Sequence, residues 1–197
     1  GSTPFGTTTT EGRLAFGLAA EPEGEIVRAA PQGSLLEQPL AALETVGAVA
    51  RHVVAEGGAG LFIDYGAAQT GFGDTLQAMR QHGFVDPLAE PGDADLTVHV
   101  DFVRMAQAGL SAGAAVHGPA TQRDFLLALG LEQRVAALSR RATPEQAAML
   151  AAGANRLVEA GSATEMGQLF KVLALAGPQL PLLPGFDLHR LPEQGAI

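Results

Sequence analysis

The residues best suited to chemistry in this chain begin with the string Ile-Asp-Tyr-Gly at positions 63–66. A carboxylate that follows a buried apolar strand lies where open α/β sheets bind their ligands. Asp64 occupies such a position, and Tyr65, the only tyrosine, would add an aromatic face and a hydroxyl group beside it. The alternative is that Asp64 caps the turn after the strand, and position alone leaves both interpretations open.

A second polar group comes from the alternation of polar and apolar residues between positions 95 and 102. Its polar members are Asp95, Thr97, His99 and Asp101. In a continuous strand His99 and Asp101 would lie about 6.6 Å apart at Cα, close enough for a histidine–carboxylate pair. Asp95 and His99 would lie roughly 13 Å apart, too far to hold one ion. The carboxylates could receive a cationic substrate; the alternative is a solvated strand face.

Two other motifs resemble catalytic signatures without meeting their requirements. The glycine loop at 66–74 begins like a phosphate-binding loop, but Phe72 and Gly73 stand where Lys and Ser or Thr are needed. The GxSxG string at 109–113 follows a helix predicted over 102–108 and precedes a strand predicted over 114–117, the reverse of a nucleophile elbow. The five histidines show no metal-ligand spacing, so we expect no metal site.

Composition narrows the classes of function further. The 197 residues are 47% hydrophobic and 17% charged, which is enough apolar material for a core. The formal net charge of −9 argues against a nucleic-acid or anionic-membrane surface. No apolar run approaches the roughly 18–20 residues that span a bilayer. The absence of cysteine excludes disulfides and thiolate catalysis. We therefore expect no nucleic acid and no membrane among the partners.

The first half of the chain predicts an α/β unit that would position these residues. An apolar stripe at helical spacing predicts a helix over 39–56, ended by the glycine pair at 57–58. Residues 60–64 then form an apolar strand buried on both faces, as in α/β folds. Residues 12–19 and 25–30 are weaker strand candidates, and residues 74–80 fit either a strand or a short helix.

The second half predicts a run of helices between two strands. Residues 114–117 and 167–176 are the strand candidates, and the pattern from 121 to 160 is helical, with Thr121 and Thr143 as N-caps. We expect residues 1–11 to be a linker or disordered. The domain then covers 12–177, and 178–197 form an irregular tail.

Four strings, in this order, resemble the MidA-like family of SAM-dependent methyltransferases, which includes the mitochondrial complex I assembly factor that methylates arginine. They are LFIDYG (61–66), GFGDTLQAMRQHGFVDPLAEPGDADLTVHVDF (71–102), GPATQRDFLLALGLEQR (118–134) and MGQLFKVLAL (166–175). The resemblance covers about residues 34–176. It implies a partial class I methyltransferase sheet, Rossmann-like, whose fifth strand ends at 63–66. Helices at about 121–160 would be inserted between the last two, antiparallel strands.

The resemblance also implies a function. The chain would be the C-terminal half of a protein arginine methyltransferase that uses S-adenosyl-L-methionine and acts in respiratory complex I assembly. Asp64, Tyr65 and Gly66 would then border the cofactor. The catalytic residues facing the substrate protein would be Asp95, His99 and Asp101. Implied partners are a complex I subunit as substrate, and the missing N-terminal half or a second copy in a homodimer. The location would be the bacterial cytoplasm, or the mitochondrial matrix in a eukaryote.

One departure from the family pattern leaves an alternative open. Such proteins carry a glycine loop and a ribose-binding acid on their first two strands, and no GxGxxG follows a strand in this sequence. We therefore expect the isolated chain to have no measurable affinity for the cofactor. The alternative function is a non-catalytic protein-interaction module that retains the methyltransferase-like sheet edge.

Overall fold

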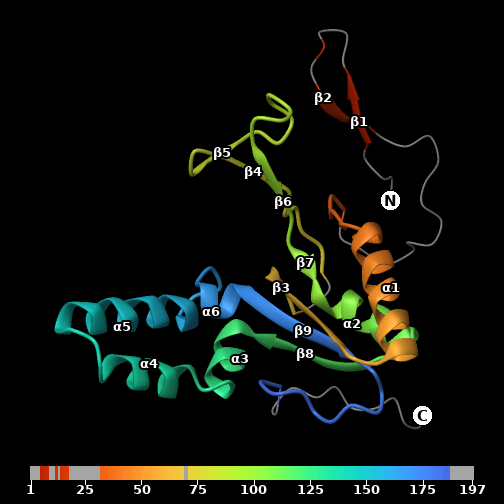
Figure 1. Cartoon of the computed structure of the whole chain (residues 1–197). Helices are drawn as coiled ribbons and strands as arrows, with labels where there is room; N and C mark the ends of the chain where they lie inside the picture. Colours follow the sequence, from red (N-terminus) through yellow and green to blue (C-terminus); the bar gives the residue numbers. More distant parts are fainter. Residues whose placement is uncertain (1–4, 9–11, 13, 18–31, 69–70, 187–197) are drawn as a thin grey trace. The chain divides into compact units, whose positions relative to one another are not determined.

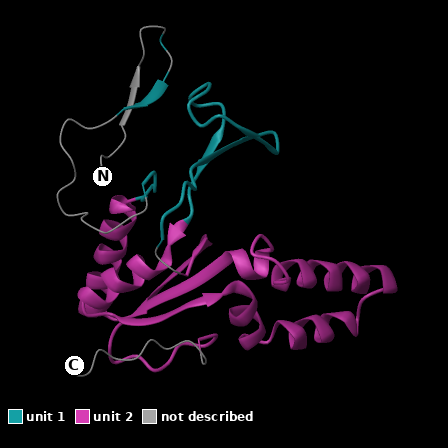
Figure 2. Cartoon of the chain, turned by 180° about the vertical axis from the view of Figure 1, so that it is seen from behind, with its two compact units in different colours: residues 1–37, 71–99 teal, residues 38–70, 100–197 magenta. Residues whose placement is uncertain are grey.

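The computed structural model describes residues 5–8, 12, 14–17, 32–68 and 71–186. The chain divides into two compact units, which Figure 2 colours separately. Unit 1 comprises residues 1–37 and 71–99, and unit 2 comprises residues 38–70 and 100–197. Unit 2 carries the larger core, so its sheet is the framework of the candidate site.

A four-stranded sheet organises unit 2 (Figure 1). Its order is β7-β3-β9-β8, formed by β3 (Ala59–Ala67), β7 (Val100–Asp101), β8 (Ala115–Thr121) and β9 (Phe170–Ala176). β9 runs antiparallel to both β3 and β8, whereas the short β7 runs parallel to β3. The antiparallel β8–β9 pair confirms the expected late pair, and β3 confirms a strand over 60–64. The expected burial of this strand on both faces is wrong, because Leu61 and Ile63 are 53% and 51% exposed.

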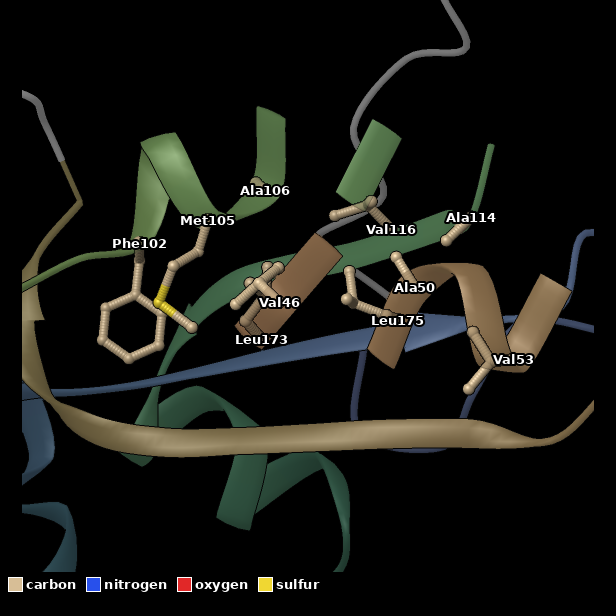
Figure 3. Close-up of a cluster of buried hydrophobic side chains, with 10 residues drawn as sticks. All are labelled: Val46, Ala50, Val53, Phe102, Met105, Ala106, Ala114, Val116, Leu173 and Leu175. Carbon is tan, nitrogen blue, oxygen red and sulfur yellow. The ribbon is translucent and has the colours of Figure 1, made fainter. Parts of the chain in front are cut away.

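Two helices cover one face of this sheet, and the main core lies beneath them. They are α1 (Leu40–Glu56), which confirms the helix expected over 39–56, and α2 (Phe102–Ser111), which confirms the helix expected over 102–108. Figure 3 shows side chains of α1 and α2 beside those of β8 and β9. Leu173 and Leu175 on β9 are fully buried there, since apolar side chains of both helices pack onto this face.

The opposite face of β8 and β9 carries a second, smaller core. Ala120, Phe125, Val172, Ala174 and Phe186 form it. The ring of Phe186 packs on that of Phe125 at a centroid distance of 5.1 Å. Residues 178–186, the described part of the expected irregular tail, form turns without a helix or strand, yet they supply this buried ring. Residues 187–197 lie outside the described part.

The helices expected between 121 and 160 are present and lie between β8 and β9. They are α3 (Gln122–Ala128), α4 (Leu131–Ser139) and α5 (Pro144–Val158), followed by α6 (Met166–Leu169). Thr121 accepts a hydrogen bond from the Asp124 N–H, and Thr143 forms a capping box with Gln146, as the sequence predicts.

The strand expected over 167–176 is shorter than predicted. Its first residues form α6, a single helical turn, and β9 begins only at Phe170. Gly167 lies in this turn, and a Cβ there would lie 2.5 Å from the carbonyl oxygen of Glu159. The turn therefore packs directly against the residues that end α5, a tertiary contact that overrides the apolar strand pattern.

Unit 1 contains two small sheets. The first pairs β1 (Phe5–Thr8) with β2 (Leu14–Gly17), and the second has the order β5-β4-β6, from β4 (Gln77–Arg80), β5 (Gly83–Val85) and β6 (Asp95–Thr97). β1 falls within residues 1–11, which were expected to be a linker, whereas β2 confirms the first weak candidate. The second candidate, 25–30, lies outside the described residues. Of the two possibilities for residues 74–80, the structure has the strand, β4, and no short helix.

The single strand expected from 95 to 102 is wrong. β6 ends at Thr97, β7 contains only Val100 and Asp101, and Phe102 begins α2. Asp101 ends the extended backbone because its carboxylate accepts the Arg104 N–H and so caps the helix. β6 pairs with β4 in unit 1, and β7 pairs with β3 in unit 2. One alternating pattern therefore serves two different sheets.

Candidate functional site

Four of the six predicted site residues meet at one edge of the unit 2 sheet. β3 and β7 are parallel, with Gly66 opposite Val100 and Ala67 opposite Asp101. Asp64, Tyr65 and Gly66 therefore lie near the carboxyl end of β3, on the same side of the sheet as Asp101 at the carboxyl end of β7. Open α/β sheets bind ligands beyond the carboxyl ends of parallel strands, so this edge is the candidate site.

Asp64 is exposed and supplies a carboxylate to this edge. Its Oδ1 accepts a hydrogen bond of 2.8 Å from the Tyr65 N–H, which fixes the carboxylate against the backbone. Asp64 also lines a hollow of about 520 Å³ between β3, α1 and α2. The other polar side chain of this hollow is Thr45, and apolar residues such as Phe102 and Met105 form most of its wall. The hollow thus offers one anionic acceptor within an apolar surface.

Tyr65 and Gly66 are held by packing. The half-buried ring of Tyr65 meets that of Phe170 edge to face, at a centroid distance of 5.6 Å and an interplanar angle of 79°. Gly66 is buried, and a Cβ there would lie 2.1 Å from the carbonyl oxygen of Val100. Glycine is therefore required for β7 to approach β3, a packing role that the sequence pattern did not reveal.

Asp101 has a structural role as well as its position at the site. Its Oδ1 accepts the Arg104 N–H at 3.0 Å, and the Arg104 guanidinium donates to Oε1 of Gln38 at 2.6 Å. These contacts join the start of α2 to the segment that leads into α1. The half-buried Asp101 carboxylate is therefore oriented by its own helix at the end of β7.

Asp95 and His99 lie in unit 1, whereas Asp101 lies in unit 2. Asp95 is exposed on β6, opposite Met79 of β4. The backbone N–H of His99 donates to Oγ1 of Thr75 at 3.0 Å. The continuous strand on which the histidine–carboxylate pair was expected is thus divided between two units.

The position of His99 depends on two residues that sequence reasoning did not identify. The Thr75 N–H donates to Oε1 of Glu37 at 2.8 Å, and the Thr75 hydroxyl donates to Oε2 of the same carboxylate. Glu37 therefore fixes Thr75, which in turn fixes the His99 backbone. The two residues are 38 positions apart and belong to no shared motif, so no sequence signal could have found them.

Lys171 is a buried cation to which sequence analysis assigned no role. Lys171 is 6% exposed, and burial lowers the pKa of its amine below the usual 10.5. The ammonium donates to the carbonyl oxygens of Gln168 and Leu169, the latter at 3.3 Å. Lys171 is also the residue directly opposite Asp64 in the β3–β9 register, so the two charges lie on neighbouring strands of the same sheet.

Metal-ligand clusters and membrane-spanning helices are both absent among the described residues. No three of their His, Cys, Asp and Glu side chains form a cluster that could hold a metal ion. Their helices include none that combines the length and apolarity needed to cross a membrane. The site at the ends of β3 and β7 offers the carboxylates of Asp64 and Asp101, the Tyr65 phenol and backbone groups.

Comparison with known proteins adds a family to this geometry. Residues 12–120 match the family model described as "Putative S-adenosyl-L-methionine-dependent methyltransferase". The chain is 37% identical over 147 residues to the protein arginine methyltransferase NDUFAF7 homolog, mitochondrial, of Drosophila melanogaster, covering 72% of this chain and 32% of that protein. The human protein arginine methyltransferase NDUFAF7, mitochondrial, is 34% identical, with 64% of this chain and 28% of that protein covered. The chain spans about a third of the length of such curated relatives.

Two solved structures from Burkholderia thailandensis share the fold. One is a native crystal structure with a TM-score of 0.78 and 28% identity, covering 95% of this chain and 52% of that one. The other is a structure bound to S-adenosyl-homocysteine, with a TM-score of 0.76 and 29% identity, covering 95% and 50%. These similarities confirm the Rossmann-like methyltransferase fold, and the family model matches more than half of the residues. The chain therefore belongs to this family of S-adenosyl-L-methionine-dependent methyltransferases.

Proposed function

We propose that this chain supplies one wall of the active site in a protein arginine methyltransferase, and that methyl transfer is an activity of the whole protein. The observation that carries the proposal is the meeting of Asp64, Tyr65 and Gly66 with Asp101 at the carboxyl ends of β3 and β7. The relatives described above are named as arginine methyltransferases, and a related structure is bound to S-adenosyl-homocysteine.

The residues at this edge fit part of the cofactor. The Asp64 carboxylate is exposed in a largely apolar hollow, where it could accept hydrogen bonds from ribose hydroxyls. The half-buried Tyr65 could contact an adenine ring. Gly66 positions both by allowing β7 to lie close to β3. The rest of the cofactor needs a glycine loop after a strand, and this sequence has no GxGxxG in that context. Further residues of the whole protein must supply it.

The chemistry asks little of the side chains beyond placement and charge. The cofactor supplies a methyl group whose bond to sulfur breaks as a bond to a guanidinium nitrogen forms, which leaves S-adenosyl-homocysteine and releases a proton. Asp101 would orient the guanidinium by charge-assisted hydrogen bonds and favour the attacking geometry. Asp95 and His99 would contribute a second carboxylate and a proton acceptor, a role that requires unit 1 to place them at this edge in the whole protein.

One side of β3 is largely unpaired and could be covered by further polypeptide. Among the described residues, β3 pairs with β9 over 59–65, but its other edge pairs only at Gly66 and Ala67, with β7. Leu61 and Ile63 on this strand are 53% and 51% exposed. An open strand edge with exposed apolar side chains is suited to another strand. We propose that an N-terminal half or a second copy covers it.

The proposed setting follows the names of the relatives. The eukaryotic relatives are named as mitochondrial, so for a eukaryotic source we propose the mitochondrial matrix. From the family resemblance in the sequence we propose a complex I subunit as the methylated protein. Nothing in the comparisons supports the cytoplasmic expectation. The acidic balance of the chain is compatible with a cationic, arginine-bearing substrate.

The direct test measures methyl transfer in the whole protein. Asp101→Asn removes the charge but keeps a good N-cap, so turnover should fall by about tenfold or more without loss of the fold. His99→Ala should also lower turnover. Glu145→Gln in the first turn of α5 is the matched control and should leave it unchanged. Unchanged turnover in both site variants would remove these residues from the mechanism.

A second test separates the enzyme from the interaction module. Calorimetric titration of the isolated chain with S-adenosyl-L-methionine should give no binding heat, because one wall alone leaves most of the cofactor exposed to water. Micromolar binding by this chain would contradict the proposal that it forms one wall only. A whole protein that neither binds the cofactor nor methylates would instead favour the non-catalytic module.

A further inference from the structure

The α4–α5 hairpin has an apolar face that the described residues of the chain leave uncovered. In sequence the two helices come between β8 and β9. In space they lie side by side (Figure 1). No residue of either helix is buried. Two amphipathic helices of this length normally bury their apolar stripes, since propensity alone gives them little stability.

The two stripes form the walls of one groove of about 720 Å³. α4 contributes Leu131, Val135 and Leu138, and α5 contributes Met149, Leu150 and Leu157. The α4 positions are three, four and seven residues apart, and the α5 lining positions 146, 149, 150, 153, 154 and 157 recur at steps of three and four, which places each set on one side of its helix. Met149 is 70% exposed although it lines the groove. The face is therefore a continuous apolar surface open to solvent.

The charges beside this groove are positive. Arg134 and Arg141 line it, and no lining residue is acidic. Both arginines are exposed, and within the described part of the chain the recorded ion pair joins Arg80 to Glu90 in unit 1. The guanidinium groups beside the groove thus have no carboxylate partner there. On a chain of net charge −9, this positive, apolar strip is distinct in chemistry from the average surface.

The charge pattern decides which occupant fits. A second copy packed face to face through the same groove would bring four arginines together, and like charges in an interface oppose association. An acidic helix would instead place carboxylates against Arg134 and Arg141. The α5 wall runs from Gln146 to Leu157, about 16 Å at 1.5 Å per residue, which matches roughly three turns of a partner helix.

A glycine in the α5 wall provides room for such a helix. A Cβ added at Gly153 would meet no heavy atom within 4 Å, and the residue lines the groove. Small residues allow two helices to approach closely. We propose that the α4–α5 groove, defined by these lining residues, binds an acidic amphipathic helix of a partner protein. The proposal does not depend on cofactor binding or on methyl transfer.

Binding can be measured with defined helical peptides of about 14 residues, roughly four turns. Three probes share a leucine stripe and carry flanking Glu, Gln or Lys, and a fourth scrambles the Glu sequence so that the stripe is lost. Fluorescence anisotropy with the full chain should give micromolar binding of the Glu peptide, at least about tenfold weaker binding of the Lys peptide, and none of the scrambled one. The preference should shrink as salt is added.

Variants assign this binding to the groove. Met149→Glu should abolish binding of the Glu peptide, and Met79→Glu, the same change at an exposed methionine of unit 1, should leave it intact. The double variant Arg134→Glu/Arg141→Glu should reverse the preference toward the Lys peptide. Gly153→Leu should weaken binding without loss of helicity, since the added side chain enters open space.

Three outcomes would overturn the proposal. The first is equal or absent binding of the Glu and Lys peptides. The second is self-association in sedimentation velocity that Met149→Glu removes, which would make a second copy the occupant. The third is Met149-dependent binding to anionic phosphatidylserine vesicles in preference to the peptides, which would make the face a membrane contact.

Discussion

The helices α1 and α5 carry similar apolar stripes, but only one stripe is buried. In α1, Val46, Ala50 and Val53 are between 0% and 4% exposed because they pack against side chains of β9 and α2. In α5, Met149 and Leu157 are 70% and 37% exposed. The comparison shows that helical periodicity predicts a face that needs a partner, while the location of that partner, inside the chain or outside it, decides whether the face is covered.

The largest expected contrast between the two regions comes from core truncation. Phe102→Ala empties a fully buried site and should lower the free energy of unfolding by about 3–5 kcal/mol. Met149→Ala should change it by less than about 0.5 kcal/mol, because the side chain is already in water. Urea denaturation followed by circular dichroism measures both. Similar losses in the two variants would mean that α5 is buried in the isolated chain.

Replacing a glycine by alanine in the two regions should change the free energy of unfolding by smaller amounts and in opposite directions. Gly66→Ala places a Cβ against the Val100 carbonyl, so it should cost about 1–3 kcal/mol and disturb the β3–β7 pairing. Gly153→Ala enters open space in a helix and should add about 0.5–1 kcal/mol. Thermal unfolding of both variants checks the signs. A neutral Gly66→Ala would show that β7 does not lie against β3.

Much of this architecture was predictable because local chemistry and tertiary packing agree. The strand at 60–64, the helix at 39–56 and the antiparallel pair of β8 and β9 follow from periodicity and from the family resemblance. Thr121 and Thr143 cap their helices as expected, because the hydroxyl of an N-cap needs only residues three positions away. Such contacts are local and are therefore visible in sequence.

The parts that could not be predicted depend on contacts distant in sequence. The helix from Phe102 was predicted, but the 95–101 segment alternates as one strand would and instead divides into β6 and β7, which belong to different units. The Gln81–His82 turn of the β4–β5 hairpin has φ values of 49° and 66° without glycine, so it lacks the usual turn signal. Phe186 is buried by Phe125 and His117, residues that no tail composition reveals.

The N-caps of α2 and α5, Asp101 and Thr143, allow the covered and the exposed region to be compared through losses of about 1 kcal/mol in stability. Asp101→Ala removes the cap of the buried α2 and should destabilise by about 1 kcal/mol, whereas Asp101→Asn should be nearly neutral. Thr143→Ala at the exposed α5 should cost a similar amount locally. Hydrogen exchange of the first-turn amides resolves the two sites. Equal stability of Asp101→Ala and the parent chain would remove the capping role of Asp101.

The smallest effect concerns pH. Burial lowers the pKa of Lys171, so the folded chain binds fewer protons than the unfolded chain between that lowered value and about 10.5. Stability should therefore rise with pH across this window from the Lys171 contribution. Lys171→Met should remove that rise, since methionine does not titrate. Denaturation midpoints at successive alkaline pH values test it, and an identical slope in the variant would contradict it.

We propose that the carboxyl ends of β3 and β7 border the methyl-donor site, while α4 and α5 do not. Hydrogen exchange of the whole protein, with and without S-adenosyl-homocysteine, compares the two regions in one measurement. We predict slower exchange over residues 64–67 and 100–104 on ligand addition, and unchanged exchange over residues 144–158 in α5. Ligand binding that leaves 64–67 and 100–104 unprotected would contradict the account.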